Sequence, residues 1–78
     1  MFKLTETIAG ALEVNADTID MNTTAELVES WDSLGQLSLV SALAEVTDGA
    51  SDKIDLSNAS SVSDIAAALK SQGIEFEI

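Results

Sequence analysis

A serine between an acidic residue and an apolar segment is the position in this chain best suited to chemistry. After Asp32, leucine, valine and alanine recur at three- and four-residue spacing, as on one face of a helix. Asp32 is the predicted N-cap, because its short side chain can accept hydrogen bonds from the first turn. Ser33 would then be the first helical residue, at the positive end of the helix dipole and beside unpaired amides. Such a position suits a serine that carries a phosphate group, although Ser33 could equally be an ordinary helix-start serine.

Composition excludes several other kinds of site. The 78 residues contain no histidine and no cysteine, so a Ser-His-Asp or Cys-His catalytic site, a thiolate metal site and a disulfide are all ruled out. The acidic segment Asp17–Asn22 lacks the alternating ligands and the central glycine of a calcium-binding EF-hand. We therefore predict no catalytic residue and no metal site.

The net charge bounds the kinds of partner. Fourteen acidic and three basic residues give a formal charge of −11, which repels nucleic acid and anionic lipid and attracts basic protein surfaces. The same charge could simply keep a small domain in solution. No apolar run approaches the roughly 20 residues of a membrane span, and the N-terminus has no secretory pattern. We expect a cytoplasmic monomer that binds neither nucleic acid nor membrane.

The apolar spacing predicts three main helices. The first starts near Phe2 and ends near Val14, and the second runs from Ser33 to Val46 or Thr47, where Asp48-Gly49 stops it. The third opens at residues 61–64, which resemble a capping box with aspartate in place of glutamate, and ends at Gly73.

The remaining segments complete the predicted fold. A long polar loop with few apolar anchors joins the first two helices, and we expect a short helical turn around Ser57–Ser60. The tail, residues 73–78, alternates like a strand but has no expected partner strand, so Phe76 should either pack onto the helices or fray. Residues 1–78 are thus predicted to be a single all-α domain, a bundle of three main helices and one short helix with a long first loop.

The motif and its surroundings resemble those of acyl carrier proteins. Asp32-Ser33-Leu34 opens an apolar helix after an acidic loop, and the fuller run from Trp31 to Gly35 resembles the discrete, specialised carriers. The resemblance covers nearly the whole chain and implies the four-helix acyl-carrier fold, with Ile19 and Leu27 of the long loop in the core. It implies that Ser33 carries 4′-phosphopantetheine through a phosphodiester, and that the thiol of this arm holds acyl groups as thioesters.

The resemblance also implies a set of partners. A phosphopantetheinyl transferase of the holo-acyl-carrier-protein-synthase type would contact Asp32. Acyl-activating, acyltransferase or ketosynthase enzymes would contact a surface that includes Trp31, Leu34, Gln36 and Leu37. Trp31 is more simply interpreted as a half-buried ring that seals the loop onto the helix. Leu34 is most simply interpreted as core or rim packing, and the residues interpreted first as core are Leu37, Val40, Leu43 and Leu69.

The chain also departs from the family pattern. Fatty-acid carriers place acids early on the exposed face of the motif helix, where this chain has Gly35, Gln36, Ser38 and Ser41. The missing early acids favour a small dedicated set of enzymes that recognise this helix more by shape than by charge. Thr47 and polar residues stand where the family tends to have an aromatic residue, which favours a short or polar cargo. The pathway could be fatty-acid, polyketide or specialised. Two alternatives stay open: an aminoacyl carrier of the D-alanyl type, and an unmodified acidic helical adaptor for a basic protein surface.

Overall fold

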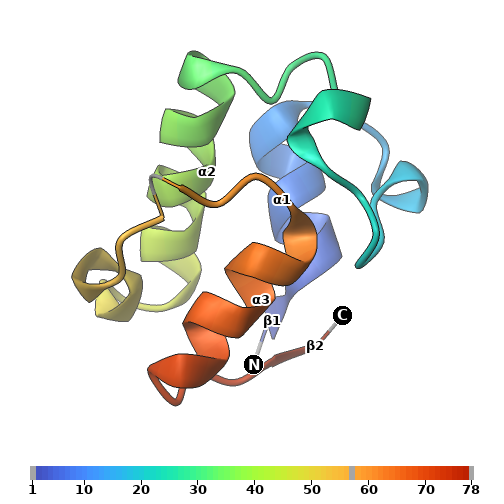
Figure 1. The fold of residues 1–78 in the computed structure, drawn as a ribbon. Helices are drawn as coiled ribbons and strands as arrows, with labels where there is room; N and C mark the ends of the chain where they lie inside the picture. Colours follow the sequence, from blue (N-terminus) through green and yellow to red (C-terminus); the bar gives the residue numbers. More distant parts are fainter. Residues whose placement is uncertain (1, 57, 78) are drawn as a thin grey trace.

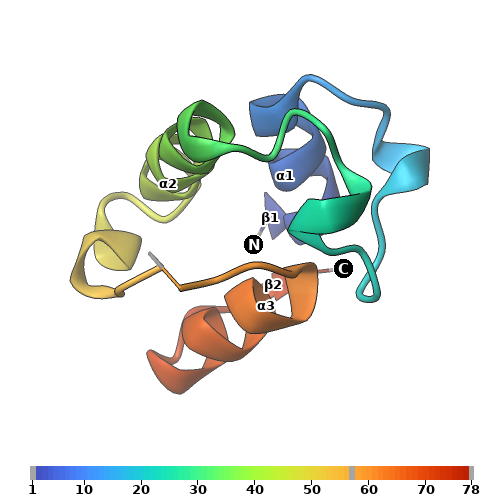
Figure 2. The same ribbon diagram turned by 45° about the horizontal axis from the view of Figure 1, so that its top comes forward.

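The computed structural model describes residues 2–56 and 58–77, and helices form most of it (Figure 1). Its three α-helices are α1 (Leu4–Leu12), α2 (Ser33–Val46) and α3 (Val62–Ser71). Three 3-10 turns lie between them, namely η1 (Ala16–Thr18), η2 (Ala25–Leu27) and η3 (Ala50–Lys53). Two short strands, β1 (Phe2–Lys3) and β2 (Phe76–Glu77), join the ends of the chain. Both views show the long segment between α1 and α2 passing outside the bundle on the side of α1, away from η3 (Figures 1 and 2).

The core forms where the apolar stripes of the three helices meet. On α1 the stripe repeats every four residues, which keeps its members on one helical face. The eight largest fully buried side chains are Leu4, Ile8 and Leu12 of α1, Leu39 and Leu43 of α2, and Val62, Ile65 and Leu69 of α3. Leu43 and Leu69 are therefore confirmed as core residues.

The predicted helix caps are present. The Asp32 side chain accepts a hydrogen bond from the Gly35 N–H at 2.9 Å, and α2 begins at Ser33. At the start of α3, Ser61 accepts from the Asp64 N–H at 3.1 Å, and Asp64 accepts from the Ser60 N–H at 3.1 Å. Asp64 therefore binds the N–H of Ser60, the residue before the N-cap Ser61, instead of the N–H of the N-cap itself. In this variant of the capping box the N–H groups of Ser60 and Asp64 both have acceptors.

The helix ends also follow the sequence signals. Asp48 and Gly49 both adopt positive φ, 53° and 85°, so the chain leaves the helical path just after α2. At the end of α3, Gly73 has φ 72°, and the Ile74 N–H donates to the Leu69 carbonyl at 3.0 Å, as in a Schellman motif.

The first helix is shorter than predicted. It begins at Leu4 because Phe2 and Lys3 form β1, and it ends at Leu12 because Glu13 takes a left-handed conformation with φ 59°. This turn lets the Val14 N–H donate to the Ala9 carbonyl at 3.0 Å. Val14 therefore lies beyond the helix rather than inside it.

The expectation that the tail has no partner strand is wrong. β2 pairs in parallel with β1, with Phe2 opposite Phe76 and Lys3 opposite Glu77. The rings of Phe2 and Phe76 lie 6.2 Å apart between centroids, so Phe76 packs at this end of the bundle instead of fraying. The fold is consequently a small helical bundle with a two-stranded sheet, rather than purely α-helical.

The short turn between α2 and α3 lies earlier than predicted. The expected turn at Ser57–Ser60 includes Ser57, which lies outside the described residues, and residues 58–60 form no helix. Instead η3 forms directly after the stop at Asp48 and Gly49.

Two leucines predicted to be in the core lie on the surface. Leu27 is 74% exposed, and Ala25 of η2 and Val28 just after it pack against the core instead, whereas Ile19 is buried as predicted. Leu37 is 67% exposed, because it lies two residues, about 200° around the helix, from the stripe that includes Leu39. Val40, also predicted as core, packs against the core while partly buried.

Candidate functional site

Ser33 lies at an exposed helix start, as the sequence predicts. Its side chain is exposed, and no hydrogen bond involves its hydroxyl within the part of the chain that the structure describes. The neighbouring Asp32 is also exposed, and Leu34 is 74% exposed. The hydroxyl is thus accessible to another molecule and does not stabilise the fold through a hydrogen bond of its own.

Gly35 holds this helix start against the end of α1. A Cβ atom at Gly35 would overlap the carbonyl oxygen of Ser30 and come within 3.0 Å of Leu12 Cδ2, so the backbone of α2 can approach the Ser30 backbone this closely only with glycine. The Ser30 hydroxyl donates to the Leu12 carbonyl at 2.7 Å, which links the loop to the last turn of α1. Sequence reasoning missed this role, although a glycine inside the first turn of a helix is a signal of close approach.

Trp31 and Gln36 form a chain of hydrogen bonds next to Ser33. The Trp31 ring is buried, with 6% of its surface exposed, and its Nε1–H donates to Gln36 Oε1 at 2.8 Å. Gln36 Nε2 in turn donates to the Leu56 carbonyl at 2.6 Å. The chain connects the loop before α2, the first turns of α2 and the segment before α3. Trp31 therefore seals the loop onto the helix as interpreted from the sequence, and more completely than the half-buried ring expected there.

The predicted site residues divide into two groups. Ser33, Asp32, Gln36, Leu37 and Trp31 all line one open surface groove of about 510 Å³. The groove is completed by small apolar side chains from η2 and from the segment before α3, Ala25 and Ala59. Leu34 does not line this groove and presents its side chain elsewhere on the surface. Trp31 is buried and Gln36 is partly buried, whereas Leu34 and Leu37 are well exposed.

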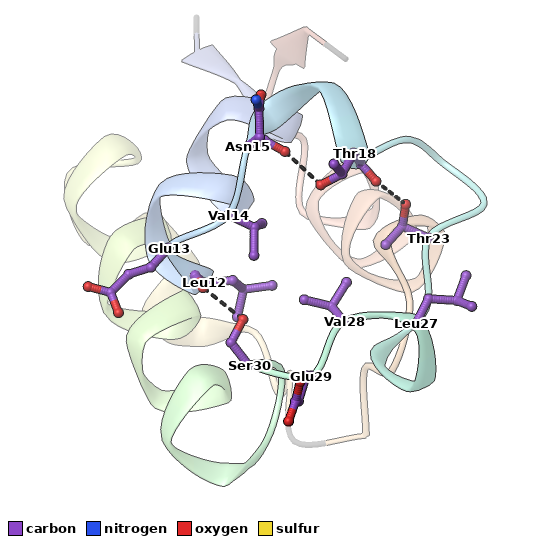
Figure 3. A pocket seen from close by; sticks show the side chains of 10 residues that line it. All are labelled: Leu12, Glu13, Val14, Asn15, Thr18, Thr23, Leu27, Val28, Glu29 and Ser30. Carbon is purple, nitrogen blue, oxygen red and sulfur yellow. Dashed lines mark hydrogen bonds between the residues drawn. The ribbon is translucent and has the colours of Figure 1, made fainter.

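A second hollow of about 640 Å³ lies between the end of α1 and the long loop (Figure 3). Its apolar lining includes Val14 and Val28, and the carboxylates of Glu13 and Glu29 point away from it (Figure 3). Its hydroxyl groups donate to backbone carbonyls: Thr18 donates to Asn15 at 2.7 Å, and Ser30 donates to Leu12 at 2.7 Å. This hollow contains none of the site residues predicted from the sequence.

The described residues contain no group of three or more acidic side chains placed to hold a metal ion. Among the same residues, no helix has the length and apolar character needed to cross a membrane.

No protein-family model, no curated protein and no solved structure matches the chain. Function has to be inferred from the residues at the start of α2 and from the groove beside them.

Proposed function

We propose that this chain is a non-catalytic acyl carrier of the acyl-carrier-protein type, and that Ser33 is the attachment site for 4′-phosphopantetheine. One observation carries the proposal. The serine of the Asp32-Ser33-Leu34 motif is the exposed first residue of the longest helix, and its hydroxyl makes no hydrogen bond within the described chain. The proposal extends to the fold, which we infer to be of the acyl-carrier kind.

The residues at this position suit a phosphodiester. A phosphate on the Ser33 oxygen would lie at the N-terminus of α2, where first-turn amides lack intrahelical acceptors and the helix dipole favours negative charge. Asp32 caps the helix through the Gly35 amide, so the amides of Ser33 and Leu34 are not used by this cap. When bound, the arm would supply a thiol that holds the acyl group as a thioester.

The chain's own contribution is attachment and presentation. Tethering a substrate near a partner's active site raises its effective concentration without any chemistry by the carrier itself. The charge of −11 favours steered encounters with basic enzyme surfaces, and the exposed Leu34 offers an apolar contact next to Ser33. We propose as partners a phosphopantetheinyl transferase, followed by acyl-activating, acyltransferase or ketosynthase enzymes, all in the cytoplasm.

The test is intact mass after incubation with coenzyme A, Mg²⁺ and a broad-specificity phosphopantetheinyl transferase. We expect one phosphopantetheine addition on the unaltered chain and none on Ser33→Ala. Ser38→Ala is the matched control, because Ser38 is an exposed serine of the same helix and should not affect the addition. The proposal fails if no addition occurs under conditions that modify an established carrier, or if Ser33→Ala is modified like the unaltered chain.

A second candidate is an unmodified adaptor that binds a basic protein surface. This candidate is favoured because three large apolar side chains are exposed on this acidic chain, namely Leu27, Leu34 and Leu37. An adaptor would keep its binding in Ser33→Ala, whereas a carrier would lose its function in that variant.

A further inference from the structure

We propose that the pantetheine part of the arm on Ser33 lies in the open groove beside that serine, and that Gln36 donates a hydrogen bond to it. The two methyl groups on the branched carbon of the arm would contact three apolar side chains of the groove, Leu37, Ala25 and Ala59. This inference rests on the proposed attachment to Ser33. Because Ser33 itself lines the groove, the part of the arm nearest the attachment point is the part within reach of these residues.

Hydrogen bonds between separate segments hold the walls of the groove in place. The Ala25 N–H donates to the Ser60 carbonyl at 2.7 Å, which fixes η2 to the segment before α3. Gln36 Nε2 donates to the Leu56 carbonyl at 2.6 Å, which fixes α2 to the same segment. A flexible arm therefore meets a groove that is already formed, and the cost of ordering falls mainly on the arm.

The apolar walls of the groove suit a small branched group. Ala25 and Ala59 are partly buried and have only methyl side chains, whereas Leu37 is 67% exposed. Close to its phosphodiester, a pantetheine arm has two methyl groups on one carbon. Contact between these methyl groups and the three side chains removes apolar surface of both from water, including part of a leucine that the fold leaves exposed.

The polar atoms of the groove include both donors and acceptors, as a chain with a hydroxyl and two amides requires. Gln36 Nε2 has two hydrogens, and among the described residues it makes one hydrogen bond, to the Leu56 carbonyl. Asp32 uses Oδ1 to cap α2, which leaves its second carboxylate oxygen as an acceptor. The amides of Ser33 and Leu34 have no intrahelical acceptor and are available to the phosphodiester.

Attachment and charge both favour the position in the groove. Binding of the tethered arm is intramolecular, with an effective concentration on the order of millimolar for a short flexible tether. Weak contacts are therefore enough to hold the arm there for much of the time. Beyond its phosphodiester the arm is uncharged, so the net charge of −11 does not repel it.

The test attaches a pantetheine analogue chemically, which is possible because the chain has no cysteine. Ser33→Cys introduces a single thiol, whose sulfur displaces bromide from the 4′-bromoacetyl ester of N-ethylpantothenamide. A C–S bond forms, the C–Br bond breaks, and the thiol proton passes to the buffer. The product has the methyl groups, hydroxyl and amides of the natural arm in their natural order. Iodoacetamide gives a control without them, and Ser71→Cys, at the last residue of α3, carries the same analogue away from the groove.

The readouts are nuclear Overhauser contacts and chemical shifts of the labelled protein. We expect contacts between the paired methyl groups of the analogue and the methyl groups of Ala25 and Ala59. The side-chain amide signals of Gln36 should shift relative to the iodoacetamide control, and neither effect should occur with the analogue on Ser71→Cys. The inference is overturned if these contacts are absent and the shifts stay within residues 32–35, because the arm would then extend into water. Unmoved Gln36 signals would refute its assignment as the donor.

Ala59→Leu tests the groove directly, because a larger side chain fills it. In the Ser33→Cys chain this substitution should remove the contacts between the analogue and Ala25 and return the Gln36 signals towards those of the iodoacetamide control. Ala67→Leu is the matched control, since Ala67 is exposed on α3 and does not line the groove. Contacts with Ala25 that survive Ala59→Leu unchanged would place the arm outside the groove and overturn the inference.

Failure of this inference and failure of the proposed function are separate results. The analogue is attached without a transferase, so its contacts report on the groove alone, whereas intact mass after transferase treatment reports on the modification of Ser33. A chain that holds the analogue in the groove but gains no phosphopantetheine from coenzyme A would refute the proposed attachment. A chain that is modified, but whose arm makes none of the expected contacts, would refute the groove.

Discussion

Gly35→Ala is expected to destabilise the domain, although alanine is a better helix former than glycine. Gly35 is buried in α2, and an added Cβ would overlap the Ser30 carbonyl oxygen and lie 3.0 Å from Leu12 Cδ2. The overlapping atom belongs to the backbone, so it cannot be relieved by rotating a side chain. The start of α2 and the Ser30 peptide would have to move apart, and a shift of Ser30 strains its 2.7 Å hydrogen bond to the Leu12 carbonyl.

The magnitude follows from two opposing terms. Overpacking of this kind costs typically 1–3 kcal/mol, and a backbone clash belongs near the upper end, about 3 kcal/mol. Replacing a helical glycine by alanine returns about 1 kcal/mol. The net loss of about 2 kcal/mol should lower the thermal midpoint by roughly 8–16 °C, at about 4–8 °C per kcal/mol for a domain of this size.

Gly10→Ala is the matched control, because it is the same substitution within another helix. Gly10 is exposed in α1 and an added Cβ meets no atom within 4 Å, so only the helix-propensity gain of about 1 kcal/mol remains. Thermal and urea unfolding followed by circular dichroism should therefore give shifts of opposite sign for the two variants. If Gly35→Ala were neutral or stabilising, the close approach of α2 to Ser30 would not be a determinant of this fold.

Two further predictions concern backbone strain and charge. Glu13→Gly should raise the free energy of unfolding by about 0.5–1 kcal/mol, because Glu13 has φ 59° and glycine adopts this conformation without the steric cost. Glu13→Ala removes the charge but keeps a Cβ, so its free energy of unfolding, measured in urea, should rise by less. An equal rise in both variants would assign the effect to the charge alone. With a net charge of −11, the thermal midpoint should rise as added NaCl shortens the Debye length from about 30 Å at 0.01 M to about 3 Å at 1 M. A midpoint independent of salt would mean that self-repulsion does not limit stability.

Features that depend on neighbouring residues were predictable from the sequence. The bounds of α2 follow from the cap at Asp32 and the stop at Asp48 and Gly49, all of which act within one turn of the helix. The pairing of Phe2 with Phe76 was not predictable in the same way, because it joins opposite ends of the chain and each strand has only two residues. Such short segments carry too little alternation to identify a partner.

The orientation of α2 could not be predicted from periodicity alone. Apolar side chains lie on more than one face of α2, namely those of Leu34, Leu37, Leu39 and Leu43. Periodicity alone therefore left open which face is buried. The close approach at Gly35 selects the face that continues through Leu39 and Leu43, and Leu37 is left exposed as a result. The contact of Gln36 with Leu56 was likewise hidden, since it depends on how the segment after α2 returns to the first turns of that helix.

Within the motif, folding explains some residues and leaves others without a structural reason. Trp31 fills the core and bonds to Gln36, Asp32 caps α2, and Gly35 permits the contact with α1. Ser33 is exposed and makes no hydrogen bond in the described part of the chain, and Leu34 is 74% exposed. Neither side chain is buried in the fold, as the proposed attachment to Ser33 and the proposed contact at Leu34 would require.

This division predicts how the motif variants will separate. Ser33→Ala should change the free energy of unfolding by no more than about 0.5 kcal/mol, as for an ordinary surface substitution. Asp32→Ala should cost about 1 kcal/mol through loss of the cap. Urea unfolding of both variants, measured beside the mass assay, would show whether a loss of modification in Ser33→Ala comes from the missing hydroxyl. A Ser33→Ala variant as unstable as Asp32→Ala would instead give Ser33 a structural role, and only Leu34 of the motif would then lack one.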